Sequence, residues 1–418
     1  MLATWIIFII QALLSHLFFI YSGIEGLPVL VVVITTFFLI FDLSQYDFPK
    51  EVFLILFLTY FLRLFLLFFD LYGRDYFVLP NSGLDSEMFN QSAITGLATG
   101  NYGNGHVYSI VIGFLYSFFG YERIIPQFFN VLLSVQTIIL VYKTMGLYNI
   151  HKKAKYFALT MIAVLPNFAI MSSILLRESI IIFLYVLSFY CFSKWFINKN
   201  YYYLTLAYIF GLLVSVFHSG SIILVIAYTI ILILYDRGKN KFTFSYKSII
   251  FAIAFGFIFW TLFQNYYDLF FAKFSNINEL DDVIDIYVMG ESGYSTGFAI
   301  ENPVLNFIVN TPVRMFYFIF SPLPWTWRGL TDVIAFFFSG LFYGYTLYLG
   351  IRHLFHKNAQ NKNLILIILF IVMGGIMVFS WGVSNAGTAL RHRDKFIGLF
   401  ILLLAITMNE MNFAQLES

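Results

Sequence analysis

Long apolar runs dominate this chain and constrain its fold more than any other feature. A transmembrane helix needs roughly 20 consecutive, mostly apolar residues, and runs near that length recur along the whole sequence. Only 11% of the 418 residues are charged and 60% are hydrophobic, whereas about 25% of a soluble domain is charged. Such a chain would expose large sticky surfaces in water. We therefore predict an all-α polytopic membrane protein, with residues 1–418 forming a single integral membrane domain.

The apolar runs predict about twelve transmembrane helices. The expected spans are Leu2–Tyr21, Leu27–Leu43, Val52–Phe69, Pro126–Thr144, Tyr156–Ser173, Ile174–Phe196, Tyr203–Phe217, Ser221–Tyr235, Ser248–Gln264, Val333–Ile351, Leu364–Trp381 and Phe396–Met408. The first run lacks a basic n-region and a small-residue cleavage site, so we expect it to be retained as a span. Two further stretches, Val107–Phe119 and Val304–Phe320, are bracketed by Gly, Pro or His and are expected to be re-entrant or interfacial helices.

Basic residues in short loops predict the orientation, because such loops remain cytoplasmic. The clearly basic loops are His151–Lys155, Lys194–Lys199, Arg237–Lys247 and Arg352–Lys362. With these loops inside, the spans alternate consistently and both termini are cytoplasmic. Two long outer loops result, residues 70–105 with an acidic motif and residues 265–331. The abundance of Tyr, Phe, Ile and Asn suggests an AT-rich genome, so we expect a bacterial inner (cytoplasmic) membrane, with the active face outside the cytoplasm.

Several cations fall on the outer side, where the orientation rule disfavours them. A cation in or near a bilayer is costly without a partner and is a functional candidate by default, and the planar arginine fork suits phosphate. The phosphate-binding candidates are Arg177, Arg314, Arg328, Arg391, His392 and Arg393. Two alternatives stay open. The run from Arg391 to Lys395 is also consistent with a solvated helix end that snorkels to headgroups, and Arg177 with local pairing to Glu178.

The first outer loop contains two acids separated by one residue, Asp85 and Glu87. In an extended segment they would share a face, and at a helix start either could cap free backbone N–H groups. Desolvation at a membrane surface and a nearby anionic ligand both raise a carboxyl pKa and favour a general base. Asp85 and Glu87 are therefore the catalytic candidates, and an ordinary helix cap is an equally good interpretation.

Aromatic and histidine residues provide the remaining candidates. Trp325 and Trp327 flank a proline-rich turn and could stack on sugar rings, although Trp also anchors helices at the membrane interface. His218 ends a span at the outer surface and is a sugar-binding candidate, and a hydrogen-bonded cap is the simpler interpretation for it and for His106. The single cysteine, Cys191, is interpreted as a packed apolar residue.

Missing motifs narrow the function. The chain contains no phosphate-binding loop, no dinucleotide fingerprint and no His/Glu pair with metal-site spacing, so we expect no cofactor and no metal. A net charge of +2 is too small to suggest a nucleic-acid partner.

Parts of the sequence resemble known membrane enzymes. Asp85–Glu87, then Ala93–Tyr102 and a helix ending in Tyr142-Lys143, followed by Leu165–Asn167 and Ser172–Ser179, resemble GT-C-fold membrane glycosyltransferases. Phe320–Trp325 and Gly387–Arg393 are similar to Wzy-type bacterial polysaccharide polymerases, which assemble O-antigen or capsule repeat units. The resemblance covers roughly residues 82–196 and, more loosely, 311–395. The acids form Asp-Ser-Glu instead of an adjacent pair, which leaves open which one is catalytic.

Both resemblances imply the same reaction. A glycan on a polyprenyl (undecaprenyl) phosphate or pyrophosphate would be transferred to an acceptor hydroxyl on the outer face, with Asp85 or Glu87 as base and arginines on the leaving phosphate. The expected partners are this donor, a glycan acceptor, membrane lipids and other polysaccharide-assembly proteins. The alternative is a flippase of lipid-linked oligosaccharide, but such a transporter would line a path through the bilayer with charges, and only Arg63 lies clearly within a span.

Overall fold

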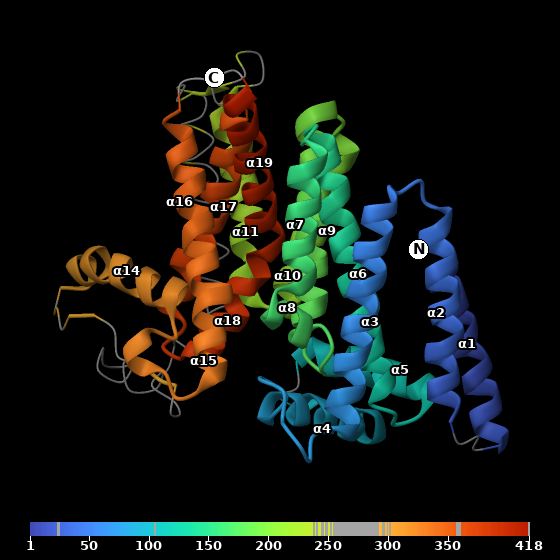
Figure 1. Ribbon diagram of the computed structural model, residues 1–418. Helices are drawn as coiled ribbons and strands as arrows, with labels where there is room; N and C mark the ends of the chain where they lie inside the picture. The colour runs from blue at the N-terminus through green and yellow to red at the C-terminus, as the bar shows by residue number, and fades with distance from the viewer. Residues whose placement is uncertain are drawn as a thin grey trace. The chain divides into compact units, whose positions relative to one another are not determined.

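The computed structural model describes residues 1–22, 26–103, 106–236, 239, 241–243, 246, 250, 253, 292–294, 297–298, 300, 302–356 and 361–416. These residues are mostly helical. The chain divides into two compact units, Met1–Tyr203 and Leu204–Ser418, which we call unit 1 and unit 2 and describe separately. Figure 1 shows the helices of both units.

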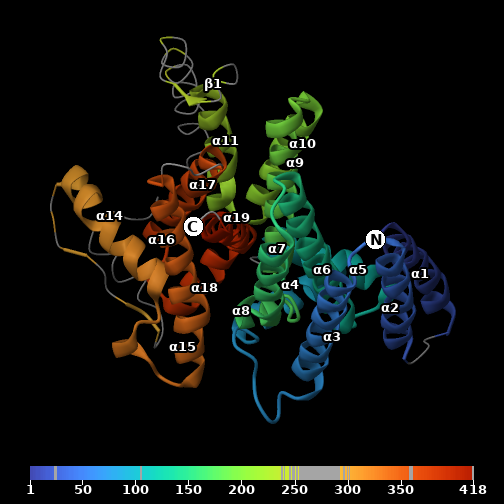
Figure 2. The ribbon, with the colours of Figure 1, turned by 45° about the horizontal axis from the view of Figure 1, so that its top comes forward.

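Unit 1 is built from helices of two kinds. The long apolar helices are α1 (Leu2–Ser22), α2 (Leu27–Gln45), α3 (Lys50–Tyr72), α6 (Ile124–Leu147) and α9 (Glu178–Asn198). The shorter ones are α4 (Leu84–Thr99), α5 (His106–Phe119), α7 (Lys152–Val164) and α8 (Pro166–Met171). In Figure 1, α4 and α5 lie across one end of the long helices, and the pairing of α1 with α2 is visible in Figure 2 as well.

Burial separates the inner helices of unit 1 from the outer ones. α6 and α9 pack along each other and bury side chains around most of their circumference, including Asn130, Thr137 and Trp195. A helix that is apolar on all sides is expected in such a position. By contrast, α2 and α3 expose large apolar side chains such as Phe37 and Phe65, as helices that face lipid do. The buried pair thus provides a rigid base for the loops at its ends.

One predicted span is interrupted in the structure. We expected a continuous helix over Tyr156–Ser173, but α7 ends at Val164 and α8 begins at Pro166. The residue before a proline is disfavoured in the helical region, and Leu165 accordingly takes ψ 116°. Figure 1 shows the short α8 below the end of α7. The predicted single span is therefore two helices that meet at Leu165.

Unit 2 begins with α10 (Tyr201–Phe217), which crosses the boundary at its first turn. The turn η2 (Ser219–Ile222), α11 (Ile223–Leu234) and the short strands β1 (Tyr235–Asp236) and β2 (Lys241–Phe242) follow. After residue 302 come α14 (Pro303–Phe320), η3 (Pro324–Thr326), α15 (Leu330–Ala335), η4 (Phe336–Leu341), α16 (Phe342–Leu354), α17 (Lys362–Trp381), α18 (Ala386–Arg393), η5 (Asp394–Phe396) and α19 (Ile397–Leu416). In Figure 1, α14 runs transverse to α16 and α17.

Among the described residues, 6 helices are long and apolar enough to cross a membrane. They are Leu27–Gln45, Lys50–Tyr72, Ile124–Leu147, Glu178–Asn198, Leu330–Leu354 and Lys362–Trp381. The apolar stretches Leu2–Leu17, Val107–Phe119, Tyr201–Phe217, Ser219–Leu234 and Leu305–Phe320 are shorter. A multi-pass membrane protein is thus supported, and the figure of about twelve spans stays a prediction. The predicted span Ser248–Gln264 and most of the loop 265–331 up to residue 301 lie largely outside the described residues.

Candidate active site

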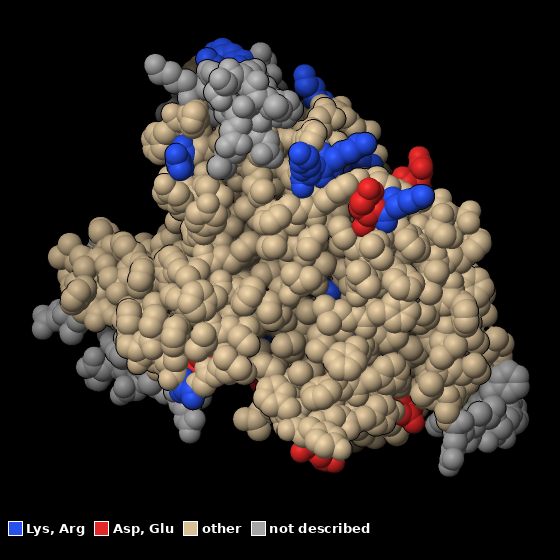
Figure 3. All heavy atoms as spheres, in the orientation of Figure 1, with Lys and Arg blue, Asp and Glu red and all other residues tan. Residues whose placement is uncertain are grey.

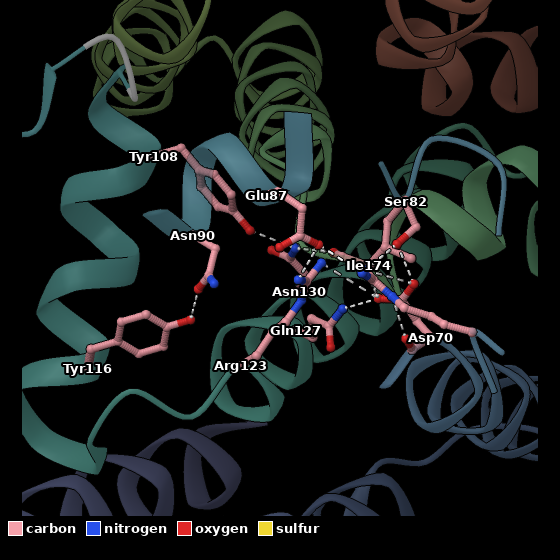
Figure 4. A network of polar contacts seen from close by, with 11 residues as sticks. Asp70, Ser82, Glu87, Asn90, Tyr108, Tyr116, Arg123, Gln127, Asn130 and Ile174 are labelled. Atoms are coloured by element: carbon pink, nitrogen blue, oxygen red, sulfur yellow. Dashed lines mark hydrogen bonds and ion pairs between the residues drawn. The ribbon is translucent and has the colours of Figure 1, made fainter. Parts of the chain in front are cut away.

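A cluster of charged and polar side chains lies at the end of unit 1 where α3 ends, α4 begins and α6 begins (Figure 4). Asp70 is at its centre and its side chain is fully buried. Its carboxylate accepts hydrogen bonds from Ser82, from Nε2 of Gln127 at 2.5 Å and from Nη2 of Arg74 at 3.4 Å. A buried carboxylate persists only when it is hydrogen-bonded or paired, and these donors satisfy that condition.

Glu87 joins the same cluster from the first turn of α4. Its Oε1 accepts from Nη1 of Arg74 at 2.8 Å and from Nη1 of Arg123 at 2.6 Å. Burial by itself would raise the pKa of Glu87, but the hydrogen bonds and charges of Arg74 and Arg123 outweigh burial and lower its pKa. A carboxylate held in its ionised form by two guanidinium groups is a weak proton acceptor, so this environment fits an anchor of α4 better than a base.

Asp85 precedes Glu87 by two residues. It lies in the first turn of α4, whose N-cap is Gly83 without a side-chain cap, so the segment is helical and neither acid is the N-cap. Residues two apart in a helix do not face each other, whereas residues four apart do. Asp85 therefore shares a face with Phe89, and Arg177 places its guanidinium carbon 5.8 Å from the centre of the Phe89 ring. Helical spacing thus places Asp85 on the side of α4 that carries Phe89, the residue that Arg177 contacts.

Two buried polar residues hold the turn that carries Arg177. Nδ2 of Asn130 lies 2.9 Å from the carbonyl oxygens of Ile174 and Leu176 and from the hydroxyl of Tyr108. From the other side, Nε of Arg63 donates to Ser172 at 3.0 Å. The turn is therefore bound to both α3 and α6, which fixes the direction in which Arg177 leaves it.

Arg63 has a second set of contacts, which explains how its charge is stabilised in the middle of a span. Its Nη1 donates to the carbonyls of Thr59 and Ala163, at 3.3 Å and 3.1 Å, and its guanidinium lies 5.0 Å from the centre of the Phe168 ring. Carbonyls at a helix C-terminus have no intrahelical partner and favour a cation. Arg63 thus caps the end of α7 that Pro166 creates.

The basic loops of unit 1 lie at the opposite end from the cluster. α3 and α7 are neighbours of α6, and the chain passes from Arg123 at the start of α6 to Lys152 after its end. In Figure 3, lysine and arginine atoms gather toward the upper edge of unit 1, and acidic atoms appear both there and at the lower edge. The assignment of His151–Lys155 to the cytoplasmic side and of Asp85 to the outer side stays a prediction.

The remaining phosphate candidates belong to unit 2. Arg393 is 1% exposed and donates Nε to Ser339 at 2.7 Å and Nη1 to the carbonyls of Phe318 and Ile319, at 2.9 Å and 2.8 Å. Arg314 lies 4.5 Å from the centre of the Trp381 ring. Arg328 forms a two-point ion pair with Asp332, with both N–O distances 2.9 Å. The local pairing therefore occupies much of Arg328.

The histidine and tryptophan candidates differ in their surroundings. Nε2 of His218 and Nε2 of His392 are 3.2 Å apart, so the structure brings these two predicted residues together. Nδ1 of His392 lies 3.4 Å from Nζ of Lys395. Trp325 is 70% exposed, whereas Trp327 donates to the carbonyl of Pro322 and packs edge-on to an aromatic ring. Trp325 is thus available to stack on a ligand and Trp327 mainly stabilises its own turn.

Sequence reasoning missed Arg74, Arg123, Asp70 and Gln127. The first two were within reach, because the orientation rule that selects Arg177 applies equally to an arginine just after one span and one just before the next. Gln127 lies within an apolar helix and can be recognised as a site residue only when its hydrogen-bond partner is known. His106 and Arg391 are in α5 and α18, respectively, and the side chain of His106 lies outside the described residues. Cys191 is buried, as interpreted.

Comparison with known proteins supports the resemblance to membrane glycosyltransferases. The model of the dolichyl-phosphate-mannose-protein mannosyltransferase family matches residues 87–276, which is less than half of the chain. The match supports a membrane glycosyltransferase of the GT-C fold with a lipid-linked sugar donor. It starts at Glu87 and includes Arg123, Arg177 and His218. No curated protein and no solved structure matches the chain. Within the described residues, no group of three or more His, Cys, Asp or Glu side chains could hold a metal ion.

Proposed function

We propose that this chain transfers a glycan from a polyprenyl phosphate or pyrophosphate to an acceptor hydroxyl on the outer face of a bacterial cytoplasmic membrane, as a step of polysaccharide assembly. The observation that carries the proposal is the arrangement on α4. Arg177 lies over the ring of Phe89, one helical turn after Asp85, and the segment from Glu87 onward matches a family whose donor is lipid-linked. One carboxylate and one guanidinium at the same helix face suit proton transfer beside a phosphate.

In the proposed reaction, Asp85 accepts the proton of the acceptor hydroxyl. The hydroxyl oxygen bonds to the anomeric carbon while the bond from that carbon to the phosphate oxygen breaks, and the electron pair leaves with the phosphate. Arg177 stabilises the charge that develops there, an interaction that is stronger in the transition state than in the ground state. The product is the lengthened acceptor and a free lipid phosphate or pyrophosphate.

Arg123 is a second proposed contact of the leaving phosphate. Its Nε and Nη2 are buried and make no hydrogen bond within the part of the chain that the structure describes. Nη2 lies 4.0 Å from the Asp70 carboxylate, which is an ion pair at long range. A guanidinium with two unused donors can take up a phosphate oxygen while its third group still holds Glu87.

The unit 2 candidates enter the proposal as predicted substrate contacts within that unit. We propose Arg314, Arg391, His392 and Arg393 as phosphate contacts, and Trp325 and His218 as sugar contacts. Arg328 would first have to release Asp332, and Trp327 its carbonyl partner. These roles remain predictions.

The orientation is proposed from the same charge pattern. Basic residues gather in the loops His151–Lys155 and Lys194–Lys199, and short basic loops stay in the cytoplasm. The Asp85 end of unit 1 is then outside. Polyprenyl-linked glycans that await assembly are exposed on that side, so donor and proposed base would meet at the same surface.

Two other functions remain as candidates. A protein acceptor is favoured by the matched family, whose description concerns protein mannosylation. The flippase interpretation receives less support, because the mid-span Arg63 is engaged by carbonyl groups and Ser172 and does not line a charged path. The product that forms, or movement of the donor without a product, separates the three candidate functions.

The test uses the full-length chain in lipid nanodiscs with a polyprenyl-linked glycan and either a glycan or a peptide acceptor. Mass spectrometry of a lengthened glycan supports the polymer role, a glycosylated peptide supports the protein acceptor, and movement of donor between leaflets of a vesicle without new product supports the flippase. Asp85→Asn should abolish product. Asp75→Asn is the matched control, because it removes the same charge from an exposed position of the same loop. Equal activity of both variants would remove Asp85 from the mechanism.

A further inference from the structure

Tyr294 is fixed in unit 2 by a short backbone pairing. The segment around Gly293 forms an antiparallel bridge with Asn385, and the backbone N–H of Tyr294 donates to the carbonyl of Ser384 at 2.8 Å. The Tyr294 ring also lies 5.4 Å from the ring of Tyr317 on α14. The hydroxyl of Tyr294 is therefore directed into the unit by two independent constraints and not by a flexible loop.

Two arginines approach this hydroxyl from different elements. Arg314 comes from α14, is 7% exposed and is held flat on Trp381, whose indole N–H donates to Thr311 at 2.9 Å. Arg393 comes from α18 and is held by Ser339 and two carbonyls of α14. Both arginines, together with Ser321, act on the titration of Tyr294: burial raises its pKa to about 12, and Ser321, Arg393 and Arg314 oppose that rise.

The polar atoms that meet there lack hydrogen-bond partners. Nε of Arg314, Nη2 of Arg393, Oγ of Ser321 and the hydroxyl of Tyr294 are all buried and make no well-formed hydrogen bond among the described residues. Buried polar atoms without a partner are rare in folded proteins, and each such atom calls for an explanation such as a bound ion. Tyr294 packs on Tyr317, and Arg393 binds the carbonyls of Phe318 and Ile319, so these donors gather near the end of α14, which Ser321 follows. Buried donors of this kind, two of them arginines, call for a ligand that accepts hydrogen bonds and carries negative charge.

From this geometry we infer that Arg314, Arg393, Ser321 and Tyr294 form an oxyanion pocket that binds a phosphoryl group. Arginine N–H groups and hydroxyls are the donors that phosphate oxygens prefer. The positive field of the two arginines disfavours a cation. The inference rests on the proposed function in one respect, namely that the phosphoryl group belongs to a lipid-linked glycan, and it adds Tyr294 and Ser321 as ligands that the sequence did not indicate.

A small depression borders this pocket. It is lined by Ser292, Gly293, Tyr294, Pro322, Thr326, Arg328 and Ala386. Tyr294 belongs both to this lining and to the group of buried donors. Arg328, which pairs with Asp332, and Pro322 therefore border the buried donors on the side of Tyr294. Trp325 precedes Thr326 of this lining in the chain and is 70% exposed.

The test measures binding of inorganic pyrophosphate to the full-length protein in phosphatidylcholine nanodiscs by calorimetry. Tyr294→Phe and Ser321→Ala remove one hydroxyl each, and Arg314→Lys keeps the charge but loses the Nε donor. Each should weaken binding roughly tenfold or more, as expected for a lost hydrogen bond to a charged group. Tyr345→Phe, at an exposed tyrosine, and Ser380→Ala, whose hydroxyl bonds to its own helix, are the matched controls and should bind like the parent protein.

The outcomes separate this inference from the proposed function. Asp85→Asn should lose transfer activity and retain pyrophosphate binding. If Asp85→Asn keeps its transfer activity, the proposed function fails, and if the pocket variants bind pyrophosphate like the parent protein, the pocket inference fails. Competition by phosphatidylglycerol discs would assign the pocket to bulk lipid headgroups, and competition only by polyprenyl phosphate would assign it to the carrier lipid. No binding in the parent protein, or equal weakening in pocket and control variants, would overturn the inference.

Discussion

Replacing Glu87 by glutamine separates an anchoring acid from a catalytic one. The change keeps size and hydrogen-bonding capacity but removes the charge between Arg74 and Arg123, whose Nη1 atoms lie 2.8 Å and 2.6 Å from Oε1. Two charges about 4 Å apart attract by about 4 kcal/mol at an effective dielectric constant near 20. Desolvation offsets most of that gain, and the Glu87 side chain is 49% exposed, so each pair should contribute about 1 kcal/mol.

We therefore expect Glu87→Gln to destabilise unit 1 by about 2 kcal/mol in total, which lowers the thermal midpoint by several degrees. Because α4 stays attached through Phe89 and Asn90, turnover at a temperature well below that midpoint should fall less than tenfold. Asp85→Asn should behave in the opposite way, with an unchanged midpoint and a loss of roughly a hundredfold or more, since a general base contributes about that factor. Both quantities are measured on the same nanodisc preparation.

A double-mutant cycle checks the physical reasoning. Arg123→Gln should cost less in the Glu87→Gln background than alone, and the difference is the coupling energy of the pair. A coupling near zero would mean that the ion pair contributes nothing. If Glu87→Gln abolishes turnover with an unchanged midpoint while Asp85→Asn remains active, the base is Glu87 and the assignment of roles is wrong.

Three further predictions follow from the same contacts. Arg74 and Arg123 lower the pKa of Glu87 below its usual value of about 4.3. The contribution of these ion pairs to stability should therefore be complete above that pH and be lost as the pH falls through the lowered pKa. A thermal midpoint that falls equally in acid for the parent and Glu87→Gln would contradict this. Arg63→Met should leave carbonyls of α7 without a donor and lower stability by roughly 2–4 kcal/mol, whereas Arg63→Lys should lose less; a stable Arg63→Met variant in denaturation assays would refute the capping role. With Cys191 buried, a membrane-impermeant maleimide applied to intact cells should label Asp75→Cys and not Lys152→Cys, and the reverse pattern would invert the proposed orientation.

The sequence predicted those structural features that depend on residues close together in the chain. Apolar runs near 20 residues predicted the long helices, and Val107–Phe119, predicted as a re-entrant or interfacial helix, is one of the shorter apolar helices. The break at Leu165 was also readable in principle, because Pro166 stands inside the predicted span and disfavours the helical region before it. Hydropathy alone averages over such a residue and so joined two helices into one.

The candidate site was less predictable, because its contacts join residues far apart in the chain. Asp85 and Glu87 were recognisable as a pair, but their separation onto two faces depends on α4 being helical from its first turn. Arg123 meets Glu87 across 36 positions and Gln127 meets Asp70 across 57. No periodicity in the sequence encodes such pairings, since they arise only when α3, α4 and α6 are packed together.

Arg63 and Arg393 show why a buried cation is an ambiguous signal for function. Each donates Nε to a serine hydroxyl and Nη1 to one or more backbone carbonyls in the last turn of a helix. In both cases a proline follows closely after the end of that helix. In both places proline leaves carbonyls without partners in an apolar setting, and a guanidinium satisfies them and opposes the negative end of the helix dipole. The two arginines differ in the hydrogen-bond donors that are left after capping. Both terminal nitrogens of Arg63 have carbonyl partners, whereas Nη2 of Arg393 has none among the described residues. Capping therefore accounts fully for Arg63 but only in part for Arg393, and the unused donor is what separates a structural arginine from one that can also bind an anion.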